Sequence, residues 1–395
     1  MSLTGETLST DRSSDESIGT TERRDLTRPS LVAETISPEA WDLFASSFDG
    51  VVQEQTFAYA AARWPNSKKE ALLFRLGPEI IGGVLVVVQA LPLRLGAIAV
   101  CKWGPVFRDA GRADAHTLYG SMIDALVAEY ATKRGIMLSV LPRAGTIAHS
   151  WQFDELMDRR FVRGSALLYP NRYFVRVGLS DVEQRRSLGQ KWRYHLGKAE
   201  HTELSFELGE AERLGEFEAL YAAMSDRKNF PELAAYETVA PLFAAEAAAL
   251  RPKLFFVRHR GEVVAGAIIF TASDTAVYLF GATNDKALPL RAGYFLHWQI
   301  IGWLRDNTRA KWYDLGGTDG FLGLHQFKKG MVGSAGAISP VPPVANYAVR
   351  WQVLALGSLA FAARTVLHRS RWHLGNWLGH RAKPDQPRPK RGQVL

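Results

Sequence analysis

The residues with the clearest capacity for chemistry lie in one stretch of the second half of the chain. Residues 312–320 read WYDLGGTDG and residues 321–330 read FLGLHQFKKG. This pattern predicts a short strand over 311–314, a glycine-rich turn and one short helix. Glycine lets a ligand approach the backbone closely, and Asp314 and Lys328 place an acid and a base on opposite sides of the turn. An ordinary strand–turn–helix corner with solvated lysines is the alternative interpretation.

A basic segment lies between the two halves of the chain. Residues 183–201 carry Arg and Lys interleaved with Trp, Tyr and His, which predicts a basic helix. A solvated helix face is one interpretation. A phosphate-binding edge is the other, because the planar guanidinium of arginine matches phosphate oxygens. The segment lies at the expected junction of two domains, where ligand clefts tend to form.

Several catalytic classes have no motif in this sequence. It contains neither a phosphate loop of the GxxxxGK(S/T) type nor a GxSxG nucleophile turn, and its ten histidines lack the spacing of a helical metal site. The one cysteine, Cys101, lies in an apolar run and is predicted to be a buried small hydrophobe. We therefore expect no metal and no covalent nucleophile, but catalysis by positioning and polarisation.

The charge of the chain is uneven. The 395 residues have a net charge of +8, and residues 346–395 hold nine Lys/Arg against one acid, which is the whole excess. Residues 346–381 are predicted to form an amphipathic basic helix, which suits either a membrane interface or a position across two domains. Residues 382–395 are expected to be a disordered basic end. Whether this tail binds lipid, RNA or protein stays open.

The N-terminal end shows no targeting pattern. Residues 1–30 are rich in Ser, Thr, Asp and Glu and are expected to be disordered, and no apolar run is long enough to span a bilayer. The sequence therefore predicts a cytoplasmic protein, with peripheral contact to the inner face of the membrane through its tail.

The order of the predicted elements repeats. Residues 75–87 and 258–270 each read as a strand, a tight turn, Glu, two β-branched residues, a small pair and another strand. Chance similarity of two hairpins is the alternative to duplication. In the first half we expect helices over 38–44, 55–64 and 113–133 and strands over 71–76, 80–90, 96–103 and 136–141. In the second half we expect helices over 211–228, 234–249 and 291–307 and strands over 276–281 and 311–314. This order predicts an α/β protein with mixed sheets.

Four motifs along the chain match one known family in order. They are Gln55-Thr56 with Tyr59, Arg63 and Trp64; Trp103-Gly104-Pro105-Val106; Tyr313-Asp314 with Gly316-Gly317; and Phe327-Lys328 with Gly330. Val32 to Val344 thereby resembles the FemAB family, which is built from two tandem GNAT-like (acyl-CoA N-acyltransferase) domains. The resemblance implies domains over 31–165 and 166–345. It also implies an N-acyltransferase that modifies an amine of a cell-envelope precursor.

The resemblance also implies roles for individual residues. Arg63 and Arg193 would bind acceptor phosphates, and Phe327 and Lys328 would line the acyl-transfer centre. A fixed ammonium there can stabilise the oxyanion that forms on the attacked carbonyl. Asp314 would orient this lysine or accept the amine proton through water. The remaining expected site residues are Tyr313, Gly316 and Gly317 for the substrate and, where the pyrophosphate loop of GNAT proteins would fall, Arg291 and Gly293.

Three functions remain open at this point. The favoured one is transfer from acyl-CoA to an envelope glycan or lipid-linked precursor, as in GNAT-like relatives of exopolysaccharide pathways. The second is an aminoacyl-tRNA-dependent transferase that builds a peptidoglycan cross-bridge. Residues 1–345 have no net charge and only the tail is basic, so the chain does not show the broad basic face that tRNA usually needs. No contact with DNA is expected. The third is a catalytically idle double-GNAT module. No tightly bound cofactor is expected in any of them.

Overall fold

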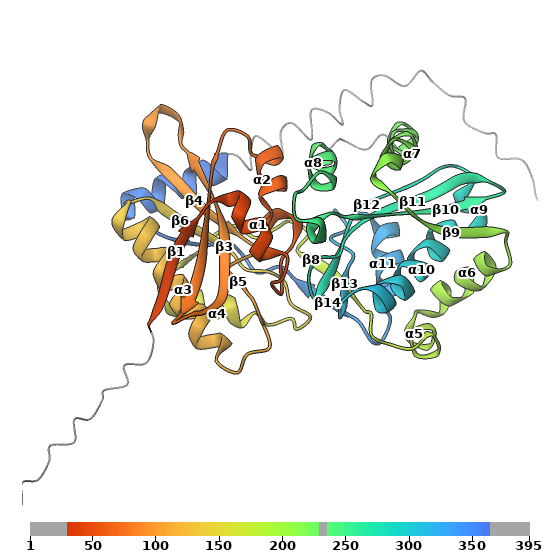
Figure 1. Ribbon diagram of the computed structural model, residues 1–395, viewed down its shortest axis with the longest axis horizontal. Coiled ribbons are helices and arrows are strands. Elements are labelled where there is room, and N and C mark those ends of the chain that lie inside the picture. Colours follow the sequence, from red (N-terminus) through yellow and green to blue (C-terminus); the bar gives the residue numbers. More distant parts are fainter. Residues whose placement is uncertain (1–29, 229–234, 364–395) are drawn as a thin grey trace, which may run out of the picture.

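A computed structural model describes residues 30–228 and 235–363 of the chain. They form two mixed sheets that lie side by side, each flanked by helices (Figure 1). Elements of the first half are β1 (Leu31–Ile36), α1 (Pro38–Ala45), α2 (Phe57–Arg63), β2 (Lys68–Leu76), β3 (Glu79–Ala90), β4 (Ala97–Lys102), β5 (Val106–Phe107), α3 (Ala115–Leu126), a π-helical turn (Val127–Lys133), β6 (Met137–Leu141), α4 (Trp151–Asp158) and β7 (Val162–Arg163).

The second half contributes a second set of elements. They are β8 (Asn171–Arg176), α5 (Asp181–Ser187), α6 (Gln190–Glu200), β9 (Leu204–Gly209), α7 (Leu214–Lys228), α8 (Val239–Phe243), β10 (Lys253–His259), β11 (Glu262–Phe270), β12 (Thr275–Thr283), α9 (Ala287–Leu290), α10 (Ala292–Asn307), β13 (Trp312–Asp314), α11 (Leu322–Val332), β14 (Ala337–Pro340) and β15 (Ala345–Tyr347). A further helix begins at Trp351 and is described as far as Ala363. Short 3-10 turns cover Gln53–Gln55, Pro92–Arg94, Ala211–Arg213, Tyr236–Thr238 and Ala248–Leu250.

The two sheets have equivalent strand orders when their strands are compared position by position. The first runs β1-β2-β3-β4-β6-β15-β7 and the second runs β9-β10-β11-β12-β13-β8-β14. In each, the central pair is parallel, β4 with β6 and β12 with β13, and the neighbouring pairs are antiparallel. The expected α/β fold of two tandem GNAT-like units is therefore confirmed.

The two units exchange one strand each. β8 follows β7 of the first sheet but pairs with β13 and β14 of the second. β15 follows β14 of the second sheet but pairs with β6 and β7 of the first. Each exchanged strand takes the same place in its sheet, and the first sheet is completed only by the distant β15, whereas the strands of the second sheet, β8 to β14, follow one another along the chain. The domain limits 31–165 and 166–345 stay a prediction.

The two units also share a hydrophobic core. One cluster of buried side chains combines Trp41, Phe48 and Leu73 of the first unit with Phe174 and Phe270 of the second. Two further cores lie under α3 and α4 in the first unit and under α6, α10 and α11 in the second. Burial of aromatic side chains across the junction holds the units in one arrangement.

Several expected elements differ from the structure. The helix expected over 183–201 is two helices, because Leu188 leaves helical geometry and the N–H of Gly189 bonds to the carbonyl of Gly330, 2.8 Å away. The helix expected over 234–249 is reduced to short turns and α8. β1 was not expected, and β15 occupies the start of the predicted basic helix at 346–381. The predictions for 1–29 and 364–395 lie outside the described residues.

Candidate active site

The second sheet opens at the carboxyl end of its central parallel strands. β12 and β13 pair at three positions, the last of them Val277 with Asp314, after which β12 continues to Thr283 paired with β11 but not with β13. On its other side β12 has a bulge at Leu279, which has no partner on β11. Diverging strands and a bulge leave backbone N–H and C=O groups available to a ligand.

The glycine-rich turn begins at this opening with a buried ion pair. Asp314, 2% exposed, accepts hydrogen bonds from Arg172 on β8 at 2.7 Å (Nη2) and 3.1 Å (Nε). It also accepts one from the backbone N–H of Gly316 at 2.9 Å. Gly316 has a φ of +74°, a conformation that glycine adopts without strain. The ion pair and the glycine together fix the path of the turn.

Lys328 closes the turn from the other side. Its ammonium, on α11, donates to the carbonyls of Leu315 and Gly317, each at 2.5 Å, and its side chain is almost fully buried. Burial, together with the charge of Arg172, lowers the pKa of Lys328 to about 8, although Asp314 acts in the opposite direction. The lysine thus remains mainly protonated at pH 7, and one of its three N–H groups is left for a substrate.

A cluster of rings surrounds this ammonium. Lys328 Nζ lies 5.9 Å from the centre of the Tyr278 ring, and His297 packs against both Tyr278 and Phe327. Tyr313 Oη and His297 Nδ1 are 3.1 Å apart. Burial, with the positive charge of Lys328, lowers the pKa of His297 to about 3, so this imidazole is neutral at pH 7. An imidazole with so low a pKa takes part in hydrogen bonds at pH 7 but does not hold a second proton.

The structure gathers six of the predicted site residues in this one place. They are Tyr313, Asp314, Gly316, Gly317, Phe327 and Lys328. One predicted contact is wrong: Asp314 bonds to Arg172 and to the turn, and not to Lys328. Sequence reasoning missed Arg172 and His297, since neither lies in a motif and both reach the site only through the pairing of β8 and the packing of α10.

The predicted phosphate-binding arginines are not brought together. Arg63 on α2 pairs with Glu237 at 3.0 Å across the junction of the units. Arg193 on α6 donates to the carbonyls of Arg186, at 3.1 Å, and Leu188. Figure 1 shows α2 at the junction and α6 at the far side of the second unit. The two arginines therefore do not form one phosphate-binding site in this structure.

The predicted donor-binding residues lie at the start of α10. Arg291 is the residue before the first turn of this helix and has a φ of +58°. Its Nη1 donates to the carbonyl of Leu288 at 3.1 Å, while its buried Nε has no hydrogen-bond partner among the described residues. Gly293 borders open space, since a Cβ built there meets no atom within 4 Å. A helix start with a free amide end and an arginine suits an anion.

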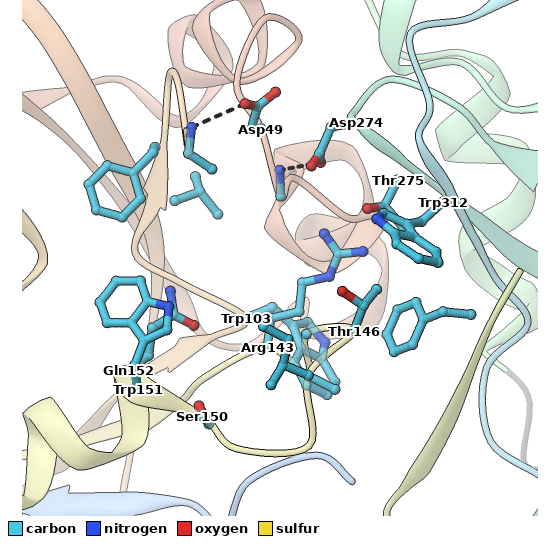
Figure 2. Close-up of a pocket in the computed structure, with 18 of the residues that line it drawn as sticks. Asp49, Trp103, Arg143, Thr146, Ser150, Trp151, Gln152, Asp274, Thr275 and Trp312 are labelled. Carbon is cyan, nitrogen blue, oxygen red and sulfur yellow. Dashed lines mark hydrogen bonds between the residues drawn. The ribbon is translucent and has the colours of Figure 1, made fainter. Parts of the chain in front are cut away.

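A separate cavity of ≈ 310 Å³ lies between the two units. Figure 2 shows Asp49, Trp103, Arg143, Thr146, Ser150, Trp151 and Gln152 of the first unit facing Asp274, Thr275 and Trp312 of the second. A small space of ≈ 10 Å³ next to it is lined by Trp103 and Arg143 and also by Arg172 and Asp314. The cavity thus shares two lining residues, Trp103 and Arg143, with a space that borders the start of the glycine-rich turn.

The second unit matches a known enzyme domain. Residues 183–329 match the family model described as an acetyltransferase (GNAT) domain. The matched segment contains α10, β13 and α11 as far as Lys329, and so includes Phe327 and Lys328. The chain is therefore an acyltransferase with a GNAT domain in its second half.

Comparison with solved structures supports the same fold for the whole chain. The crystal structure of FemX is 14% identical, covers 83% of this chain and 100% of its own, and superimposes with a TM-score of 0.68. A conserved protein of unknown function from Bacteroides thetaiotaomicron is 13% identical, with coverages of 80% and 98% and a TM-score of 0.50. The C-terminal domain of a putative lysylphosphatidylglycerol synthetase from Agrobacterium fabrum is 15% identical, with coverages of 83% and 97% and a TM-score of 0.49. None of the curated proteins matches this sequence significantly. The resemblance to the FemAB fold inferred from the motifs is confirmed.

Proposed function

We propose that this GNAT-type acyltransferase transfers an acyl group from acyl-CoA to an amine of a cell-envelope glycan or lipid-linked precursor. The observation that carries the proposal is the opening between β12 and β13, which lies inside the matched GNAT segment and ends at the turn held by Lys328. GNAT domains use acyl-CoA as a co-substrate, and an opening between parallel strands admits its extended acyl arm.

The residues around the opening account for the chemistry. The acceptor nitrogen attacks the thioester carbonyl, and the negative charge that develops on its oxygen is stabilised by backbone N–H groups at the opening and by the remaining N–H of Lys328. The C–S bond then breaks and the thiolate leaves with a proton. Lys328, with a pKa of about 8, is matched to this transfer because a thiol has a pKa near 8.5.

The proton on the attacking amine needs a base. His297 is neutral at pH 7, because its pKa is lowered to about 3 by burial and by Lys328, and it bonds to Tyr313. This proton leaves through water, and we assign Tyr313 and His297 to hydrogen-bonding that water, because an imidazole with so low a pKa does not hold a proton at pH 7. Arg291 and Gly293, at the start of α10, hold the pyrophosphate of the donor.

An aminoacyl-tRNA donor is the second candidate, and the FemX-like fold of the whole chain favours it. One experiment separates the donors: titration of the purified protein with acetyl-CoA and with a charged tRNA at two salt concentrations, together with release of free CoA thiol in the presence of amino-sugar acceptors. We expect acetyl-CoA to bind with little salt dependence and thiol to be released. Salt-sensitive binding of charged tRNA alone would instead support a cross-bridge enzyme. Binding of neither would support an idle module.

The C-terminal end supports a place at the membrane surface. No helix among the described residues is long and apolar enough to cross a bilayer. The helix that begins at Trp351 has no charged residue up to Ala363, and its exposed positions Trp351, Ala355, Leu359 and Ala362 recur at helical spacing. Trp351 is 73% exposed and Leu359 66%. The basic residues of 364–395 follow directly, a combination that suits an anionic lipid surface.

A hairpin tip lies at the same end of the first sheet. Gly357 packs against Met137, which is paired with Ile98, next to the turn between β3 and β4. Leu93 in that turn is 90% exposed. Flotation with phosphatidylglycerol vesicles tests the surface: Trp351→Ser and Leu93→Ser should each weaken binding, and Val182→Ser, an exposed apolar control on α5, should not. Equal binding of all variants would refute it.

A further inference from the structure

The cavity between the units lies at an edge of the first sheet where ligands commonly bind. Trp103 follows β4, and Arg143 follows β6, so the cavity lies at the carboxyl ends of the central parallel strands. The glycine-rich turn has the same position in the second sheet. Ligands of open α/β sheets bind at the carboxyl ends of parallel strands. The first unit thus keeps a ligand-sized space where the second has its turn.

Arg143 is a cation without a hydrogen-bond partner. In the part of the chain that the structure describes, no group accepts a hydrogen bond from its guanidinium, and Nη2 is fully buried. Burial lowers the pKa of Arg143, although the negative charges of Asp314 and Asp274 oppose this effect. A buried donor left unpaired is costly, which favours a ligand that supplies the acceptor.

The acids of the cavity do not serve as that acceptor. Asp274 accepts hydrogen bonds from the N–H of Gly50 at 2.9 Å and from the hydroxyl of Ser273 at 2.8 Å. Asp49 is paired with Arg309 at 2.6 Å. Both carboxylates are thus already engaged, and Arg143 remains for an oxyanion, which its planar fork can bind in a bidentate manner.

The remaining walls fit a sugar ring. Trp103, Trp151 and Trp312 present apolar ring surfaces (Figure 2), and Thr146, Ser150, Gln152 and Thr275 present hydroxyl and amide groups. A pyranose has C–H groups on its faces and hydroxyls at its rim, so it needs both kinds of wall. Trp103 also has a φ of +61°, a strained conformation for a bulky residue and one that concentrates at functional sites.

We propose that this cavity binds an anionic sugar unit of the acceptor, with Arg143 on its carboxylate or phosphate and the tryptophans on its ring faces. The proposal rests on the proposed transfer to an envelope precursor. Trp103 and Arg143 line both the cavity and a small space that Arg172 and Asp314 also line, so an acceptor held in the cavity lies close to the glycine-rich turn. The cavity anchors the acceptor, and the opening between β12 and β13 receives the donor.

Calorimetric titration of the full-length protein without any acyl donor tests the cavity by itself. The probes are glucose 1-phosphate, glucuronate, neutral glucose and inorganic phosphate. We expect both anionic sugars to bind at least about tenfold more tightly than glucose or inorganic phosphate. Glucose 1-phosphate alone would assign the site to phosphorylated sugars, and glucuronate alone to acidic sugars.

Variants decide whether Arg143 is responsible. Arg143→Gln should weaken the anionic sugars about tenfold or more, as expected for the loss of a charge-assisted bidentate contact. Trp151→Ala should weaken the sugars but not inorganic phosphate. Arg108→Gln, at an exposed arginine outside the cavity, serves as the matched control and should change nothing.

Three results would overturn the proposal: no binding of either anionic sugar, equal binding of glucose, or unchanged affinity in Arg143→Gln. Failure of the proposed function is seen separately, as loss of acetyl-CoA binding while the sugars still bind. In that case the cavity remains a sugar site and its role as an acceptor anchor is wrong.

Discussion

The two units share a strand order but differ at the carboxyl ends of their central parallel strands. In the first sheet β4 and β6 pair at five positions and stay together to Lys102 and Leu141. In the second sheet β12 and β13 pair at three positions and then part. After these strands each unit has a cationic side chain. Arg143 of the first unit has no hydrogen-bond partner among the described residues, whereas Lys328 of the second donates to two carbonyls.

This difference shows how one fold can serve two tasks. Where the strands diverge, their backbone N–H groups are free to polarise the carbonyl of an acyl group. The lysine holds the neighbouring turn in place by its hydrogen bonds. Strands that stay paired leave only side chains to bind a ligand, which suits recognition. The following variants challenge or refine this division of labour.

The largest effect on stability is expected from Asp314→Asn. The change leaves the guanidinium of Arg172 buried beside Lys328 without a counter-charge, and breaking such a pair costs about 3–5 kcal/mol. Urea unfolding measures the loss. Glu203→Gln is the control, because its pair with Arg260 is 73% exposed on both sides and its loss should change the free energy of unfolding far less. Similar losses in both variants would show that the buried pair is not a special feature of the second unit.

Lys328→Ala should lower kcat/KM by at least about a hundredfold, because it removes an N–H from the reacting carbonyl and the brace of the turn. Steady-state release of CoA thiol measures it, with Lys329→Ala, an exposed neighbour, as the control. Far-ultraviolet circular dichroism distinguishes this loss from unfolding. An active Lys328→Ala enzyme would exclude this lysine from catalysis.

The pH dependence of turnover follows from the same group. The pKa of Lys328 is lowered to about 8 by burial and by Arg172, so the protonated form that the mechanism uses declines above pH 8, by about tenfold per unit. Lys328→Arg keeps its proton and should therefore show no such decline, but its turnover should be lower because a guanidinium does not pass a proton to the thiolate.

The free energy of unfolding should rise with pH, whereas turnover falls. Because the folded pKa of Lys328 is below the unfolded value near 10.4, the unfolded chain binds more protons between about pH 8 and pH 10, and this group adds stability as the pH rises through that window. The contribution should disappear in Lys328→Met. Urea titrations at both ends of the window measure it, and an unchanged slope in the variant would contradict the assignment.

The smallest effect is expected from the turn backbone. Gly316→Ala places a Cβ at a φ of +74° and should cost about 1 kcal/mol, with a matching fall in activity. Gly317, which lacks a positive φ, provides the control: Gly317→Ala should cost less. Thermal unfolding and turnover of both variants test whether the turn requires this one glycine.

Much of the fold could be predicted from local patterns. The helix expected over 38–44 is α1, and the runs 80–90 and 291–307 closely match β3 and α10. The break between α5 and α6 could not be predicted, because it depends on a contact of Gly189 with Gly330, which is far away in the sequence. The exchange of β8 and β15 could not be predicted from the sequence for the same reason, because strand pairing is set by tertiary contacts.

The site was predictable only where its residues share one stretch. Tyr313 and Asp314 end β13, and Lys328 lies on α11, the next helix along the chain, so their spacing in the sequence indicated their proximity. Arg172 and Arg143 come from other elements and have no motif around them. The expected use of Arg63 and Arg193 still rests on resemblance alone, since the structure engages the first with Glu237 and the second with backbone carbonyls.

The exchange of strands also sets an order of events during synthesis. A chain that has just left the ribosome as far as β7 lacks the strand that separates β7 from β6, since that place belongs to β15 near residue 345. Domains usually fold as units from the N-terminus during translation. Here the first unit must wait for nearly the whole chain, so the first half cannot be expressed alone with a complete sheet, although the second sheet, β8 to β14, comes from one continuous segment.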